Sequence, residues 1–269
     1  MLTTPWAFVK RDCAQAASYK IYFVAQLVDV LFIAAIFYFM GQIFREAAAP
    51  ALTPYGGNYF AFIFIGVAFT DYLSVSLTAF HTSIRESQMM GTLEILLMTP
   101  VKLSTILICS SLWPYLFTSY RFILYLAVGA FLFGLDLGSA NLLSTLVVLI
   151  LSILCFATLG ILTASIVMVI KKGGDWSKLF LTGVSVLLGG VAYPVSVLPG
   201  WLKSLSAFIP LTHSLNAMRQ ALLQGRTLAD LRPDLLSLGL FSLVLWPLSL
   251  WIFQLSVKQT KVTGSLSQY

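Results

Sequence analysis

Six long apolar runs constrain this chain more than any other feature of its sequence. Each is long enough to cross a bilayer, which takes about 20 apolar residues. The predicted spans are residues 21–44, 58–80, 105–133, 141–170, 179–198 and 235–257. The segments outside the spans are at most about 35 residues long, whereas independent domains start at about 50 residues. The sequence therefore predicts an all-α membrane protein with one transmembrane domain over residues 1–269, without a soluble catalytic domain.

The composition agrees with a membrane protein. Hydrophobic residues make up 59% of the chain and charged residues 10%, whereas about a quarter of a soluble domain is charged. The net charge of +6 could suggest nucleic acid as a partner. Its placement along the chain argues for lipid instead.

Lysine and arginine concentrate on one side of a six-span topology. That side carries Lys10, Arg11, Lys20, Arg85, Lys102, Lys171, Lys172, Lys178, Lys258 and Lys261. The other side carries Arg45, Lys203, Arg219, Arg226 and Arg232. Because short cytoplasmic loops are enriched in positive charge, both termini are expected in the cytoplasm, with the protein in the plasma (bacterial inner) membrane. Anionic lipid suits the basic face better than nucleic acid.

Neither a metal nor a nucleotide site is evident in the sequence. The three cysteines are scattered, and His81 and His213 fall on opposite sides of the predicted topology, so these side chains cannot share a metal. Residues 171–178 contain glycines and lysines without the order of a phosphate-binding loop. We expect no cofactor bound by this chain and no enzymatic activity.

The first 20 residues predict a helix lying in the cytoplasmic membrane interface. Apolar residues recur at helical spacing from Leu2 to Ala17, and Trp6 is placed to anchor at the level of the lipid headgroups. Such a helix either only anchors the protein or helps to hold a partner, and the sequence leaves both open.

Three charged residues lie inside predicted spans: Asp29 in the first, Asp71 in the second and Arg121 in the third. A charge within the membrane is a functional candidate because it costs several kcal/mol to insert facing lipid. The favoured interpretation is a structural ion pair of Arg121 with Asp71 or Asp29. Contact with a substrate and proton coupling are the alternatives.

Residues 84–100 are too polar to span the membrane and too apolar for an ordinary loop. Ser83 and Glu86 form a capping box, which predicts a helix start at Ser83, and Pro100 prevents the helix from continuing. The amphipathicity is imperfect, with apolar side chains facing two ways. This short helix either covers its own spans and lipid or meets a soluble partner.

Two further features concern packing and the region before the last span. The short connection around Asp136 predicts that the third and fourth spans form a tight antiparallel hairpin. Residues 198–225 are apolar but are broken by Pro199, Gly200 and Pro210 into two pieces too short to cross the bilayer. We expect two short helices that dip into the outer leaflet and return, with Gly225 capping the second. The alternative is a pair of helices lying flat on the outer surface.

Two segments together resemble the permeases of the type-two ABC exporter family. Residues 91–101, GTLEILLMTPV, are similar to that family's cytoplasmic loop, with its Gly-Thr-Leu-Glu core ending in a proline. Residues 193–225 are similar to its outer segment before the last span, with L-P, P-L-T-H and A-x-R elements. The acidic run that usually precedes the first motif is thin here.

The resemblance implies a homodimer, or a dimer of related permeases, with two copies of a separate cytoplasmic ABC ATPase that binds ATP and Mg²⁺. Residues 84–100 would be a coupling helix seated in the ATPase, and residues 198–225 an outer re-entrant gate. The implied coupling residues are Glu86, Gly91, Thr92, Leu93, Glu94, Leu97 and Pro100. The implied gate residues are Pro194, Pro199, Gly200, Pro210, His213 and Arg219.

The predicted function is therefore that of a permease subunit of an ATP-driven exporter. Spans rich in Phe, Leu and Tyr favour an amphipathic, lipid-linked or drug-like substrate. The alternative function is an ion-coupled secondary transporter that uses Asp29 and Asp71.

Overall fold

The computed structural model describes residues 3–89, 103–169 and 182–262, and all the regular elements within them are helical. The elements are α1 (Thr3–Ser18), α2 (Lys20–Leu52), η1 (Thr53–Tyr55), α3 (Tyr59–Met89), α5 (Leu103–Phe133), α6 (Leu142–Val169), η2 (Val195–Val197), α8 (Gly200–Ser206), α9 (Pro210–Leu223) and α10 (Arg232–Val262). Residues 182–188 are also helical. Within the described residues, α2, α3, α5, α6 and α10 are the five helices long and apolar enough to cross a membrane.

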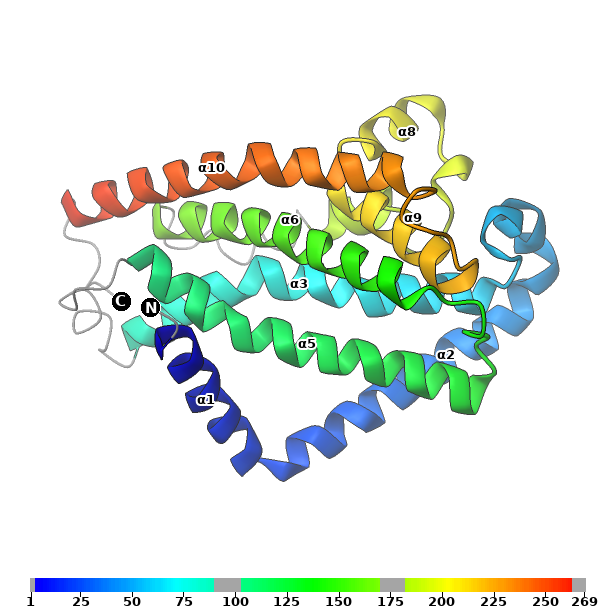
Figure 1. Ribbon diagram of the computed structural model, residues 1–269, viewed down its shortest axis with the longest axis horizontal. Helices are drawn as coiled ribbons and strands as arrows, with labels where there is room; N and C mark the ends of the chain where they lie inside the picture. The colour runs from blue at the N-terminus through cyan, green and yellow to red at the C-terminus, as the bar shows by residue number, and fades with distance from the viewer. Residues whose placement is uncertain (1–2, 90–102, 170–181, 263–269) are drawn as a thin grey trace.

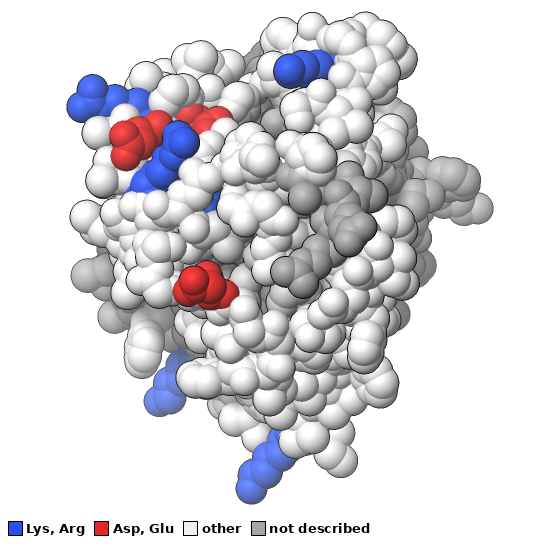
Figure 2. Space-filling view, turned by 90° about the vertical axis from the view of Figure 1, so that its right-hand side faces the viewer, with Lys and Arg blue, Asp and Glu red and all other residues white. Residues whose placement is uncertain are grey.

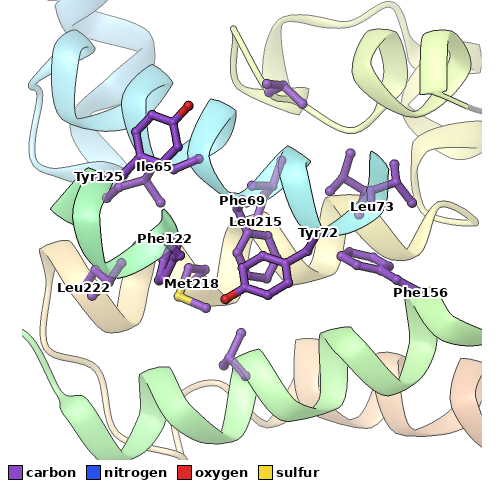
Figure 3. Packing of buried hydrophobic residues seen from close by; sticks show 14 of the residues in the cluster. Ile65, Phe69, Tyr72, Leu73, Phe122, Tyr125, Phe156, Leu215, Met218 and Leu222 are labelled. Atoms are coloured by element: carbon purple, nitrogen blue, oxygen red, sulfur yellow. The ribbon is translucent and has the colours of Figure 1, made fainter. Parts of the chain in front are cut away.

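Helix α3 forms the centre of the bundle. It packs against α2, α5, α6 and α9 (Figure 1), and 72% of its membrane-length window is buried, against 11% for α2 and for α10. Figure 3 shows Phe69 and Tyr72 of α3 meeting Phe122, Phe156 and Met218, which come from three other helices. Accordingly, α2 and α10 are left to present most of their apolar side chains outward.

Helices α5 and α6 do not form the predicted tight hairpin. The connection between them is short, from residue 134 to 141, but α3 lies between them in Figure 1. Helix α5 packs mainly on α3, and α6 packs on α10 and α3. The prediction was wrong because loop length says only that two helices are near at one end. Helix α3 separates them along the rest of their length.

Helices α3 and α6 approach closely at Gly160. A Cβ atom there would lie 2.0 Å from the carbonyl oxygen of Ser76. One turn further on, Thr163 Oγ1 donates to the carbonyl of Leu77 at 3.1 Å. Small and hydroxylic residues at this spacing permit close packing between membrane helices.

Two helix boundaries differ from those predicted. Helix α3 continues through Ser83 to Met89, so the predicted helix start at Ser83 is wrong. No Gly or Pro interrupts residues 80–89, and Ser83 Oγ donates to Ser110 Oγ of α5 at 2.9 Å. Helix α2 continues past residue 44 to Leu52, because residues 47–49 are alanines, which have the strongest intrinsic helix preference.

The fifth apolar run is not a continuous helix to its predicted end at residue 198. Its first residues lie outside the described part of the chain, and the described part is helical only over 182–188. The chain then turns at Gly189 and Gly190, and Gly190 has φ +72°. A left-handed residue ends a helix, and glycine adopts it without a steric penalty.

Two short helices, α8 and α9, occupy the segment predicted to contain them. Pro210 is the first residue of α9, where its missing N–H has no intrahelical partner to lose. After α9, Gly225 has φ +62°, as expected for a glycine that ends a helix. A Cβ at Gly225 would lie 2.1 Å from the carbonyl oxygen of Ser139, so no larger residue fits this contact.

Candidate functional sites

The three charged residues inside the spans meet at one point. Arg121 Nη2 on α5 lies 2.9 Å from Asp29 Oδ2 on α2 and 3.3 Å from Asp71 Oδ2 on α3. The same nitrogen is 3.5 Å from the hydroxyl of Tyr125. The predicted ion pair is therefore present, and it involves both carboxylates instead of one. We call Asp29, Asp71 and Arg121 the charged triad.

The charged triad joins three helices and carries more negative than positive charge. Two carboxylates face one guanidinium, and the side chain of Asp29 is the most exposed of the three at 51%. A charge pair within a membrane offsets much of the cost of inserting each charge alone. The geometry accounts for α2, α3 and α5 holding together at this depth, and it leaves Asp29 partly accessible.

Arg219 forms a clamp on backbone carbonyls at the end of the bundle where α9 lies. Its guanidinium donates to the carbonyls of Phe62 at 3.0 Å, Gly190 at 2.7 Å and Val191 at 2.7 Å. It is fully buried and lies 3.4 Å from the centre of the Phe62 ring. The guanidinium group is planar and carries five N–H donors, so it can bind several carbonyl oxygens at once. Arg219 thereby fixes the turn that follows residues 182–188 against α3.

His213 links α9 to the start of α10. Its Nδ1 lies 3.0 Å from Asp234 Oδ1, and its Nε2 lies 3.0 Å from the carbonyl oxygen of Ala207. The hydrogen bond with Asp234 raises the pKa of His213, the carbonyl of Ala207 adds to this, and partial burial opposes it. Because both neighbours can only accept, the imidazolium form satisfies both contacts at once.

Further polar contacts tie this end of the molecule together. Asn216 donates to the second oxygen of Asp234 at 2.6 Å, and the hydroxyl of Tyr55 donates to Asn216 at 2.9 Å. Gln224 donates to the carbonyl of Pro54. These bonds join η1, α9 and α10. Sequence reasoning missed Asp234, although an acidic residue in the first turn of a helix is a signal that could have drawn attention to it.

The remaining predicted gate residues set turns. Pro194 precedes η2, Pro199 precedes α8, and Gly200 is the first residue of α8. Ser206, at the end of α8, donates from its hydroxyl to the carbonyl of Leu188 at 2.7 Å. The structure thus brings the predicted gate residues to one end of the molecule, where proline and glycine direct the chain and Arg219 and His213 make the polar contacts.

The predicted coupling residues cannot be placed in the same way. Glu86 falls within α3. Gly91, Thr92, Leu93, Glu94, Leu97 and Pro100 lie outside the described residues. In the described part of the chain, no group of three or more His, Cys, Asp or Glu is arranged to hold a metal ion.

The helices and the paired charges identify the general class of protein. The described residues contain five membrane-length helices, one of them buried at the centre, and charged side chains are paired inside the bundle; this is a multi-pass integral membrane protein. The family model described as ABC-2 type transporter matches residues 5–223, and the chain belongs to that family. A search among curated proteins found no match. The protein is thus a transmembrane permease subunit of an ABC-2 type transporter and is not itself catalytic.

The family also bears on the cofactor and the partners. In such systems the ATPase is a separate subunit, and ABC-2 permeases generally pair with ABC ATPase subunits. Membership of an ATP-driven family disfavours the alternative of an ion-coupled secondary transporter. The structure adds that Arg121 engages both carboxylates on which that alternative depends.

Proposed function

We propose that the chain is the permease of an ATP-driven exporter that moves an amphipathic, lipid-linked or drug-like substrate outward. Two permease copies work with two copies of a separate ABC ATPase, which binds ATP and Mg²⁺. Membership of the ABC-2 family supports this proposal. The GTLEILLMTPV motif at residues 91–101 supports the position of the ATPase contact.

The observation that carries the proposal is the continuity of α3. This helix runs unbroken over 31 residues, about 46 Å at 1.5 Å per residue. One end leads directly into the segment that contains the coupling motif. Near the other end, the carbonyl of Phe62 accepts a hydrogen bond from Arg219 of α9. A single buried rod therefore connects the proposed ATPase contact with the proposed outer gate.

This connection suggests how ATP energy reaches the gate. ATP binding closes the two ATPases, which push on residues 84–100. Because α3 is continuous and largely buried over residues 59–80, displacement at its end is transmitted along its axis instead of being absorbed locally. The Arg219 clamp passes it to α9 and to the turn at Gly190. The spans then rotate, and a path at the interface between the two permeases opens outward.

The proposed orientation places both termini in the cytoplasm of a bacterial cell, with the protein in its inner membrane. The excess of lysine and arginine on the side of residues 84–100 supports it. Figure 2 views the end of the molecule that would face outward. The charged side chains on this face are few and of both signs. Uncharged residues, drawn in white, form most of it. In this orientation, α1 lies in the cytoplasmic interface, and α8 and α9 form the outer re-entrant segment.

The test of the coupling contact is the charge reversal Glu94→Arg, measured with the partner ABC ATPase. We expect loss of transport-coupled ATP hydrolysis with normal membrane insertion, because the groove that receives Glu94 would meet the opposite charge. Glu46→Arg is the matched control, since it changes the same residue type in the outer part of α2. Normal stimulation of the ATPase by Glu94→Arg would contradict the assignment.

The ion-coupled alternative makes a different prediction. Transport would persist without any ATPase and would collapse in Asp29→Asn or Asp71→Asn. Measuring substrate movement in vesicles with and without the ATPase separates the two mechanisms.

A further inference from the structure

The contact between α2 and α5 carries a stripe of aromatic side chains that leads to the charged triad. On α2, the residues facing this contact follow helical spacing: Tyr22, Phe23, Gln26 and Asp29. On α5, the facing residues follow the same spacing: Trp113, Phe117, Tyr120 and Arg121. Residues three, four and seven apart lie on one side of a helix. We call these eight residues the α2–α5 seam.

The rings of the seam form one connected cluster. Tyr22 stacks on Phe117 with ring centres 5.2 Å apart, and Phe23 lies 5.9 Å from Phe117 and 6.0 Å from Tyr120. Trp113, four residues before Phe117 on the same helix, extends the cluster, with ring centres 6.3 Å apart. Tyr22 is 45% exposed and Tyr120 40%. The cluster is therefore not sealed in the core, and its aromatic surface is reachable from outside the bundle.

The polar end of the seam has more acceptors than donors. The charged triad has a formal charge of −1, and the side chain of Asp29 is half exposed. Gln26 Oε1 is buried and accepts no hydrogen bond, and Asp71 Oδ2 has the 3.3 Å ion-pair contact with Arg121 Nη2. An uncompensated carboxylate charge in a membrane costs several kcal/mol. The seam thus presents the half-exposed carboxylate of Asp29 beside accessible rings.

We propose that the α2–α5 seam binds the cationic group of an amphipathic organic substrate. Aromatic faces attract ammonium groups, most strongly where water is excluded, and a carboxylate next to them adds charge complementarity. The apolar ring edges take the body of the molecule, while Asp29 takes the charge. A bare metal ion fits less well, because it needs several oxygen ligands around one point, and the seam spreads its acceptors along a line of rings.

This inference deepens the proposed export function by naming the substrate class, and it rests on that function. Its test uses binding alone, without ATPase or ATP, so that its failure is distinct from failure of the export proposal. The full chain is placed in lipid nanodiscs, and binding of radiolabelled tetraphenylphosphonium is measured by scintillation proximity. Tetraphenylborate, of the same size and opposite charge, is the matched ligand control.

We expect saturable binding of tetraphenylphosphonium, weakened about tenfold or more by Asp29→Asn. Phe117→Leu, which removes a ring but keeps the charged triad, should weaken it about threefold or more. Asp136→Asn, in the connection between α5 and α6, should leave binding unchanged. Tetraphenylborate should show no difference between the wild type and Asp29→Asn.

Three results would overturn the inference. One is equal tetraphenylphosphonium binding by the wild type and Asp29→Asn. Another is binding lost in Asp29→Asn but unaffected by Phe117→Leu, which would leave only a site for a proton or small cation. The third is non-saturable binding of both ions, which is partition into lipid only. Elution of each variant as a single species in size-exclusion chromatography shows that lost binding is not lost folding.

Discussion

Replacing Gly66 by alanine should break the Arg219 clamp without touching Arg219 itself. A Cβ at Gly66 would lie 2.4 Å from Arg219 Nη2 and 2.5 Å from the carbonyl oxygen of Val191. These two atoms are the donor and acceptor of one of the clamp's hydrogen bonds, 2.7 Å apart. The new methyl group would occupy the space on which that bond depends.

The expected cost follows from two effects. Overpacking a tight site costs about 1–3 kcal/mol, and a hydrogen bond to a charged group contributes about 1.5–3 kcal/mol. Alanine has a stronger helix preference than glycine, which offsets about 1 kcal/mol of this loss of stability. We expect the free energy of unfolding to fall by about 1.5–5 kcal/mol, which is a drop in Tm of about 3–20 °C for a protein of this size.

The assay is thermal unfolding of the purified protein in detergent, followed by circular dichroism or by loss of the monodisperse peak. Gly239→Ala on α10 is the matched control, because a Cβ there meets nothing within 4 Å. That variant should have an unchanged or slightly higher Tm. If Gly66→Ala and Gly239→Ala unfolded at the same temperature, the reasoning that Gly66 is required by the clamp would be refuted.

Two further predictions concern the other polar contacts. His213 has its pKa raised by Asp234, so the stabilisation from this contact should be fully present below about pH 6.5, the ordinary pKa of histidine, and should be lost as pH rises through the raised value. A Tm series from pH 5.5 to 9 checks this, and Asp234→Asn should remove the dependence; a flat profile in the wild type would contradict it. Arg121→Leu leaves Asp29 and Asp71 facing each other without a cation and should destabilise the fold by about 3–5 kcal/mol. Protein yield and Tm test it, and adding Asp71→Asn should restore part of the loss.

The sequence was a good guide where local chemistry leaves one outcome. Apolar runs of membrane length became α2, α3, α5, α6 and α10, because a backbone crossing lipid must satisfy its hydrogen bonds within a helix. The pairing of Arg121 with carboxylates followed from the cost of an unpaired charge in a span. Gly225 and Pro210 fell at helix ends for conformational reasons that belong to those residues alone.

The sequence was a poor guide where several local outcomes were possible. The capping box at Ser83 is a preference of about 1 kcal/mol, and packing of α3 along its length overrode it. The partners of Arg219 are backbone carbonyls, which every residue carries, so no side chain in the sequence marks them. Asp234 meets His213 only because α9 and the start of α10 fold back beside each other.

By itself, the sequence determined that this is a helical membrane protein of the ABC-2 permease kind, because apolar length and the two motifs are properties of contiguous residues. Only the tertiary structure decided which helix is central. All five membrane-length helices are apolar enough to be buried, and composition does not rank them. The contacts of α3 with α2, α5, α6 and α9 settle that it is central. The charged triad and the Arg219 clamp therefore both include a residue of α3, Asp71 in the triad and the carbonyl of Phe62 in the clamp.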